Sequence, residues 1–102
     1  MAKIDNQNRL VVPKDLIKIS HTDFSNELRL FVCGKELFID NPSSQNSKRY
    51  CLGEVHLDDH NRFFVPKLAR ELLNLKSGDN ISFYVQNNRV TFKKVFFIPE
   101  NR

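Results

Sequence analysis

The sequence predicts a mostly β single domain, in which two copies of one structural unit fold together and close into a barrel with two short helices. A stretch beginning at Asp5 recurs at Asp58 (58 − 5 = 53), and both stretches read Asp-x-x-Asn-Arg, three apolar residues ending in Val, then Pro-Lys. The apolar positions that follow each stretch keep the same register. The 102 residues, 40% of them hydrophobic, suffice for one modest core, whereas one copy alone does not.

The first copy, residues 1–41, is expected to form two short strands around a polar turn, then a helix and a hairpin. Asn8 suits the turn because asparagine tolerates left-handed backbone angles. Pro13 suits the first position of a helix, where its missing N–H costs nothing. Alternation in the hairpin directs Leu30 inward and Phe31 outward. The expected elements are strands over 2–5, 9–12, 28–32 and 37–39, and a helix over 14–20.

Residues 42–49 predict a surface linker, because they are rich in serine and asparagine and nearly devoid of apolar side chains. The Lys48-Arg49 pair within it is expected to be solvated. The second copy, residues 50–95, repeats the pattern, with strands over 50–57 and 62–65, a helix opening at Pro66 and a hairpin turning at Asn87-Asn88. The residues expected to form the buried stripe of that helix are Leu68, Ala69, Leu72 and Leu73. Residues 96–102 form an apolar tail.

The net charge of +4 permits a nucleic-acid partner without demonstrating one. Cys33 and Cys51 form no CxxC motif, so we expect two reduced thiols buried as small hydrophobes, with a disulfide as the alternative. No signal peptide opens the chain, and no apolar run approaches the ~20 residues that span a bilayer. The expected location is the cytoplasm, with no membrane association.

Taken together, these residues resemble the AbrB-type family, which includes transition-state regulators, MazE-type antitoxins and MraZ regulators. The shared features are an Asp-x-x-x-Arg motif, an apolar strand, a proline, a short helix and a hairpin, over residues 3–41 and 56–95. MraZ likewise carries two copies in one chain. The family usually has glycine before the motif arginine, where this chain has Asn8 and Asn61. The resemblance implies a pseudo-two-fold swapped-hairpin (double-split) β-barrel that binds double-stranded DNA.

Two interpretations of Arg9 and Arg62 follow from the residues alone. Each arginine could pair locally with the aspartate four positions earlier, or could present its guanidinium to phosphate or guanine. The resemblance favours DNA contact, with Asp5, Asn8, Asp58 and Asn61 supporting the motif. Cations on the short helices are expected to join the arginines in a basic strip that binds phosphate. The expected DNA-binding residues are Lys3, Arg9, Lys14, Lys18, Arg62, Lys67 and Arg70.

A metal site is not expected, although His56 and His60 flank two carboxylates at a spacing that could ligate zinc. The first copy has Lys3 and Gln7 at the corresponding positions, and no histidine or cysteine cluster elsewhere matches them. The sequence also shows no nucleophile–base set and no glycine-rich phosphate loop. We therefore expect neither a cofactor nor an enzyme.

The expected function is that of a DNA-binding regulator of transcription. One alternative is a MazE-type antitoxin that binds a toxin and its own promoter; that class normally adds a long, often acidic C-terminal segment, whereas few residues follow Lys94 here. Another alternative is a barrel that serves only assembly, with self-association through Phe96, Phe97 and Ile98.

Overall fold

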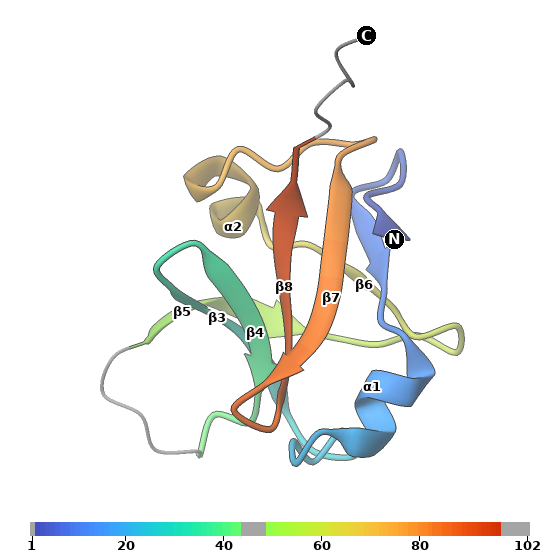
Figure 1. Cartoon of the computed structure of the whole chain (residues 1–102), viewed down its shortest axis with the longest axis vertical. Helices are drawn as coiled ribbons and strands as arrows, with labels where there is room; N and C mark the ends of the chain where they lie inside the picture. Colours follow the sequence, from blue (N-terminus) through green and yellow to red (C-terminus); the bar gives the residue numbers. More distant parts are fainter. Residues whose placement is uncertain (1, 44–48, 97–102) are drawn as a thin grey trace, which may run out of the picture.

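A computed structural model describes residues 2–43 and 49–96, which form a mostly β body with two short helices (Figure 1). The elements are β1 (Ala2–Lys3), β2 (Arg9–Val11), α1 (Lys14–Ile19), β3 (Leu28–Cys33), β4 (Glu36–Asp40), β5 (Tyr50–Val55), β6 (Arg62–Phe64), α2 (Lys67–Leu72), β7 (Asn80–Gln86) and β8 (Arg89–Val95). The predicted order of strands and helices is confirmed. Several strands end one or two residues earlier than predicted, because the chain enters the aspartate turns or the prolines there.

The strands form two antiparallel sheets rather than one closed sheet. Six strands lie in the order β1-β7-β8-β4-β3-β5, and β2 pairs separately with β6. We call this second pair the β2–β6 ribbon. Its central residues, Leu10 and Phe63, are fully buried, and the ring of Phe63 lies 6.1 Å from that of Phe92 in β8. The ribbon therefore packs on the inner face of the larger sheet, with the apolar core between them.

The strand pairing follows the sequence duplication. The β2–β6 ladder is centred on Leu10 and Phe63, which are equivalent in the two copies (63 − 10 = 53). The β4–β8 ladder is centred on Phe38 and Thr91, which are also equivalent (91 − 38 = 53). In addition, β1 pairs with β7 of the second copy, and β5 pairs with β3 of the first. The first strand of each copy thus completes the hairpin of the other.

The position of α2 depends on a glycine in β5. Gly53 has φ +149°, beside an irregularity in the β3–β5 pairing. A Cβ atom at Gly53 would lie 2.9 Å from Cβ of Pro66, so only glycine allows the start of α2 to pack this closely. Ala69 is the buried residue of the helix.

The prediction of a four-residue buried stripe on α2 was wrong for two residues. Leu68 and Leu72 are exposed, while Leu73 is half-buried. The helix is six residues long and contacts the body through Ala69, so its remaining faces stay open. The chain continues past the helix to bury Leu75 instead.

The prediction that both cysteines are buried was also wrong. Cys33 is the last residue of β3 and Cys51 lies near the start of β5, where neither strand is covered. Both are exposed free thiols.

The outer face of the β3–β4 hairpin carries a small aromatic cluster. Phe31, predicted to face solvent, is buried and stacks on Phe38 with ring centroids 5.6 Å apart. The guanidinium carbon of Arg49 lies 3.7 Å from the centre of the Phe31 ring. The prediction that Arg49 is solvated was therefore wrong, because the arginine covers an aromatic surface and meets a buried acid. Lys48 lies outside the described residues.

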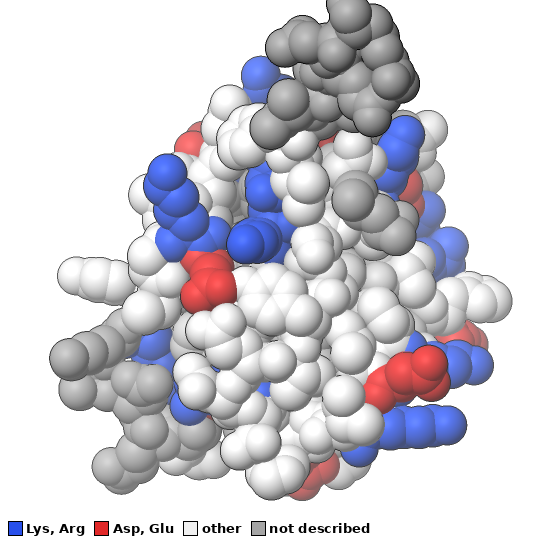
Figure 2. Space-filling view, in the orientation of Figure 1, with Lys and Arg blue, Asp and Glu red and all other residues white. Residues whose placement is uncertain are grey.

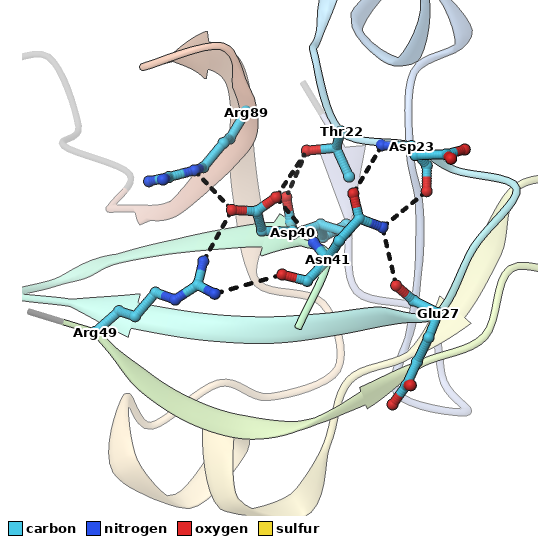
Figure 3. A network of polar contacts seen from close by, with 8 residues as sticks. Thr22, Asp23, Glu27, Asp40, Asn41, Arg49 and Arg89 are labelled. Atoms are coloured by element: carbon cyan, nitrogen blue, oxygen red, sulfur yellow. Dashed lines mark hydrogen bonds and ion pairs between the residues drawn. The ribbon is translucent and has the colours of Figure 1, made fainter. Parts of the chain in front are cut away.

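Asp40 is that acid, and it lies at the centre of a polar network (Figure 3). Its Oδ2 accepts ion pairs from Arg49 and Arg89, both at 2.8 Å, and the side chains of Asp40 and Arg49 are each 6% exposed. The hydroxyl of Thr22 donates to the carbonyl of Ile39 and to Asp40. The network attaches Thr22, in the segment after α1, and Arg49, the last residue of the linker, to Asp40 at the end of β4.

We expect Asp40→Asn to lower the free energy of unfolding by about 3 kcal/mol, because the two arginines would lose a buried counter-charge. Urea denaturation measures this loss. Arg29→Ala is the matched control, since the Arg29–Glu27 pair is substantially exposed and contributes no more than about 1 kcal/mol. Equal losses in the two variants would contradict the prediction.

Candidate nucleic-acid interface

The solvent-facing side of the β2–β6 ribbon carries two arginines and two apolar residues. The buried central pair fixes this orientation, because side chains alternate between the faces of a strand. The residues on this side are Arg9 and Arg62, which are half-buried, and Val11 and Phe64, which are exposed. Arg9 lies opposite Phe64, and Val11 lies opposite Arg62. The two arginines are therefore diagonal neighbours, with Cα atoms about 7–8 Å apart.

In the second copy, one aspartate organises the whole turn that precedes Arg62. Oδ1 of Asp58 accepts backbone N–H groups of His60 and Arg62, each at 2.9 Å. Oδ2 of Asp58 accepts Nε–H of Arg62 at 2.8 Å. Asn61 adopts φ +58°, as expected for asparagine in a left-handed turn position.

The first copy repeats this geometry. Asp5 accepts the backbone N–H groups of Gln7 at 2.9 Å and Arg9 at 2.8 Å, and its Oδ2 accepts Nε–H of Arg9 at 2.8 Å. Asn8 has φ +62°. The local Asp–Arg pair, one of the two interpretations of the motif, is present in both copies, and the positive φ of both asparagines fits the expected turn.

The aspartates use the Nε side of each guanidinium and leave its outer end available. Within the described part of the chain, the Nη groups of Arg9 and Arg62 make no hydrogen bond. Each arginine is therefore held in a fixed direction while keeping four N–H donors for a ligand. The local-pair and ligand-contact interpretations are compatible.

The same contacts shift the pKa values of the aspartates. The backbone N–H of Arg62 is the main cause that lowers the pKa of Asp58 to about 2, with help from the guanidinium and from the N–H of His60. Partial burial acts to raise the pKa of Asp5, but the N–H groups of Arg9 and Gln7 and the guanidinium outweigh it and lower that pKa. Both carboxylates are therefore charged at neutral pH.

The other predicted cations flank the ribbon. Helices α1 and α2 follow β2 and β6 through Pro13 and Pro66, and they lie at opposite sides of the molecule (Figure 1). Lys14 and Lys18 are exposed on α1, and Lys67 is exposed on α2. The remaining two differ: Lys3 is exposed on β1, whereas Arg70 is half-buried and donates Nε–H to the carbonyl of Val65 at 3.2 Å.

The two exposed apolar residues of this face, Val11 and Phe64, were not among the residues predicted from the sequence. Val11 is 50% exposed and Phe64 is 63% exposed, and the guanidinium carbon of Arg9 lies 5.9 Å from the Phe64 ring centre. The signal was present in the alternation of Arg9 with Val11, since residues two apart share one face of a strand.

The zinc site considered for the segment from His56 to His60 has no matching cluster of ligands among the described residues. Among residues 2–43 and 49–96, no three His, Cys, Asp or Glu side chains converge. The predicted self-association segment is described only at its first residue: Phe96 is exposed, and Phe97 and Ile98 lie outside the described residues.

Comparisons of the chain with protein-family models, with curated proteins and with solved structures found no match. Neither helix in the described part of the chain is long and apolar enough to cross a membrane.

We expect Asn8→Ala and Asn61→Ala each to lower the free energy of unfolding by about 1 kcal/mol, because alanine resists left-handed angles. Asn8→Gly and Asn61→Gly are the matched controls and should change it by less than about 0.5 kcal/mol. Urea denaturation provides the measurement. Losses as large in the glycine variants as in the alanine variants would show that the backbone angle is not what asparagine supplies.

Lowering the pH should weaken the turn of the second copy. The folded-state pKa of Asp58 lies below its ordinary value of 3.8, so its stabilisation is fully present above about pH 4 and is lost as pH falls toward about 2. Asp58→Asn should therefore show a smaller fall in Tm across this range than the parent protein. Asp15→Asn, which changes an exposed carboxylate on α1, should keep the parental fall. An unchanged fall in Asp58→Asn would refute the assignment.

Proposed function

We propose that this protein is a DNA-binding regulator of transcription that presents the β2–β6 ribbon to double-stranded DNA. The observation that carries the proposal is the pair of arginines, each held by an aspartate through Nε and left with its Nη groups available. Guanidinium groups in a fixed direction suit bidentate contact with guanine or phosphate. The local pairing orients the arginines before DNA arrives.

The ribbon is a two-stranded antiparallel element, which is a type of element that the DNA major groove accepts. The major groove, about 12 Å wide, admits a two-stranded β ribbon. Arg9 and Arg62 would contact base edges or phosphates there. Val11 and Phe64 lie beside them and would contact thymine methyl groups.

The cations at either end of the ribbon would contact the DNA backbone. Lys14 and Lys18 extend from one side and Lys67 from the other, so phosphate contacts would flank the ribbon. The roles proposed for Lys3 and Arg70 are weaker contacts of the same kind. Because phosphates carry no base identity, these residues would supply affinity and salt dependence rather than sequence preference.

We also propose that the fold is a pseudo-two-fold swapped-hairpin, double-split barrel. Two ladders centred on equivalent residues support this fold, as does the pairing of each first strand with the hairpin of the other copy. Such an arrangement would relate the two motif turns by the pseudo-two-fold axis at the centre of the ribbon. The DNA site would then have two related halves.

The test is DNA binding by arginine variants, on duplexes enriched from a random pool by the parent protein. Arg9→Ala and Arg62→Ala should each cost roughly 1–3 kcal/mol, which is about 5- to 150-fold in Kd, and should relax sequence preference. Lys14→Ala and Lys67→Ala should weaken binding to all sequences and reduce the salt slope.

Arg29→Ala is the matched control, because Arg29 also pairs with a carboxylate but lies in β3, away from the ribbon. Thermal unfolding separates contact from bracing. Loss of a partly exposed Asp–Arg pair should cost no more than about 1 kcal/mol of stability, so a larger loss of stability would indicate that the arginine mainly braces the turn. The proposal fails if no duplex is enriched, or if the double arginine variant keeps parental affinity.

A further inference from the structure

A second surface feature lies away from the arginine face, between the end of α2, the tip of the β3–β4 hairpin and the end of β8. It is a groove of about 360 Å³ whose lining is mainly apolar. Leu37 and Leu75 form its buried floor, and Leu73 is half-buried beside them. Leu72 and Phe96 line it while remaining largely exposed.

The duplication provides an internal comparison for this groove. The equivalent place in the first copy lies between the end of α1 and the β7–β8 hairpin. There the backbone N–H of His21 donates to the carbonyl of Asn88 at 2.7 Å, and Thr22 reaches Asp40. The corresponding residues in the second copy are Asn74 and Lys35, and no hydrogen bond joins them within the described residues. The first site is thus bridged by polar contacts and holds a smaller, polar pocket of about 200 Å³, whereas the second is a larger and mainly apolar groove of about 360 Å³.

Two side chains that line the open groove differ in character from their equivalents in the first copy. Thr22 corresponds to Leu75 (75 − 22 = 53), which makes the floor apolar. Asp40 corresponds to Lys93 (93 − 40 = 53), which places a cation at the rim. The groove is therefore a distinct surface and not an unfilled copy of the polar network.

The rim is basic. The lining contains Lys35, Lys93 and Lys94 and no acidic residue. Lys94 is held in place by the carbonyl of Asn74 at 2.9 Å and by Asp79 at 3.2 Å. Lys35 and Lys93 are exposed. Figure 2 shows Lys and Arg atoms over the tip of the β3–β4 hairpin and beside the upper part of β8.

We infer that this groove binds an acidic amphipathic segment of a partner protein, an interaction separate from the proposed DNA contact. Apolar side chains of the segment fill the space over Leu37 and Leu75, and its carboxylates meet the lysines at the rim. A second copy of this chain would bring its own exposed lysines, Lys35 and Lys93, to the same surface if the two grooves met, and like charges would repel. A nucleic acid would leave the apolar floor without a partner.

The probe for the test is a labelled synthetic helix with leucines at i, i+3, i+4 and i+7 and glutamates elsewhere, titrated by fluorescence anisotropy. Leu72→Ser and Lys35→Glu should each weaken binding about tenfold. Ile19→Ser is the matched control for Leu72→Ser, because Ile19 is its equivalent in the first copy and is 61% exposed against 58% for Leu72. It should change Kd less than twofold.

A helix with lysines in place of the glutamates tests the role of charge and should not bind. The inference is overturned by equal binding of this reversed helix, by an equal effect of Ile19→Ser, or by no saturable binding up to about 1 mM of the acidic helix. Sedimentation provides a further check. If Leu72→Ser instead dissociates a dimer of the full chain, the occupant is a second copy and the inference is wrong.

Discussion

Neither copy of the duplicated unit can satisfy all of its own strand backbones, because β2 of the first copy pairs with β6 of the second, and this constraint shapes the rest of the structure. The N–H of Val12 donates to the carbonyl of Asn61, and the N–H of Val65 donates to the carbonyl of Asn8, both at 2.8 Å. These reciprocal bonds close the ribbon at its two ends. Since buried backbone groups need partners, the ribbon forms when both copies are folded together. The relative placement of the two arginines is set by this ladder and not by either turn alone.

Local chemistry made much of this arrangement predictable. The left-handed turn needs a residue such as Asn8, the helix starts tolerate Pro13 and Pro66, and the strands keep a two-residue alternation. Each of these signals acts over a few residues, so a single sequence contains it in full. The duplication strengthened them, because two independent copies of the motif point to the same local structure.

The wrong predictions concern residues whose burial depends on contacts with parts of the chain that are distant in the sequence. Leu68 and Leu72 match a helical stripe, but the contact of Pro66 with Gly53 sets which face of α2 meets the body. Arg49 lies in a polar linker, yet a buried acid and an aromatic ring from the first copy surround its guanidinium. The residues next to Arg49 and Pro66 in the sequence give no indication of these long-range contacts. The exposed Phe64 is different, because strand alternation alone could have placed it beside the arginines.

Joining both copies in one chain also changes what a single mutation can do. In a dimer of identical chains, every substitution appears twice and must suit both symmetric positions. Here Asp40 and Lys93 occupy equivalent positions with opposite charge (93 − 40 = 53), and among the described residues the buried Asp40 forms two ion pairs. Because both copies lie in one chain, a substitution in one copy leaves the other copy unchanged. The two halves are free to specialise, one holding the molecule together while the other acquires a different surface.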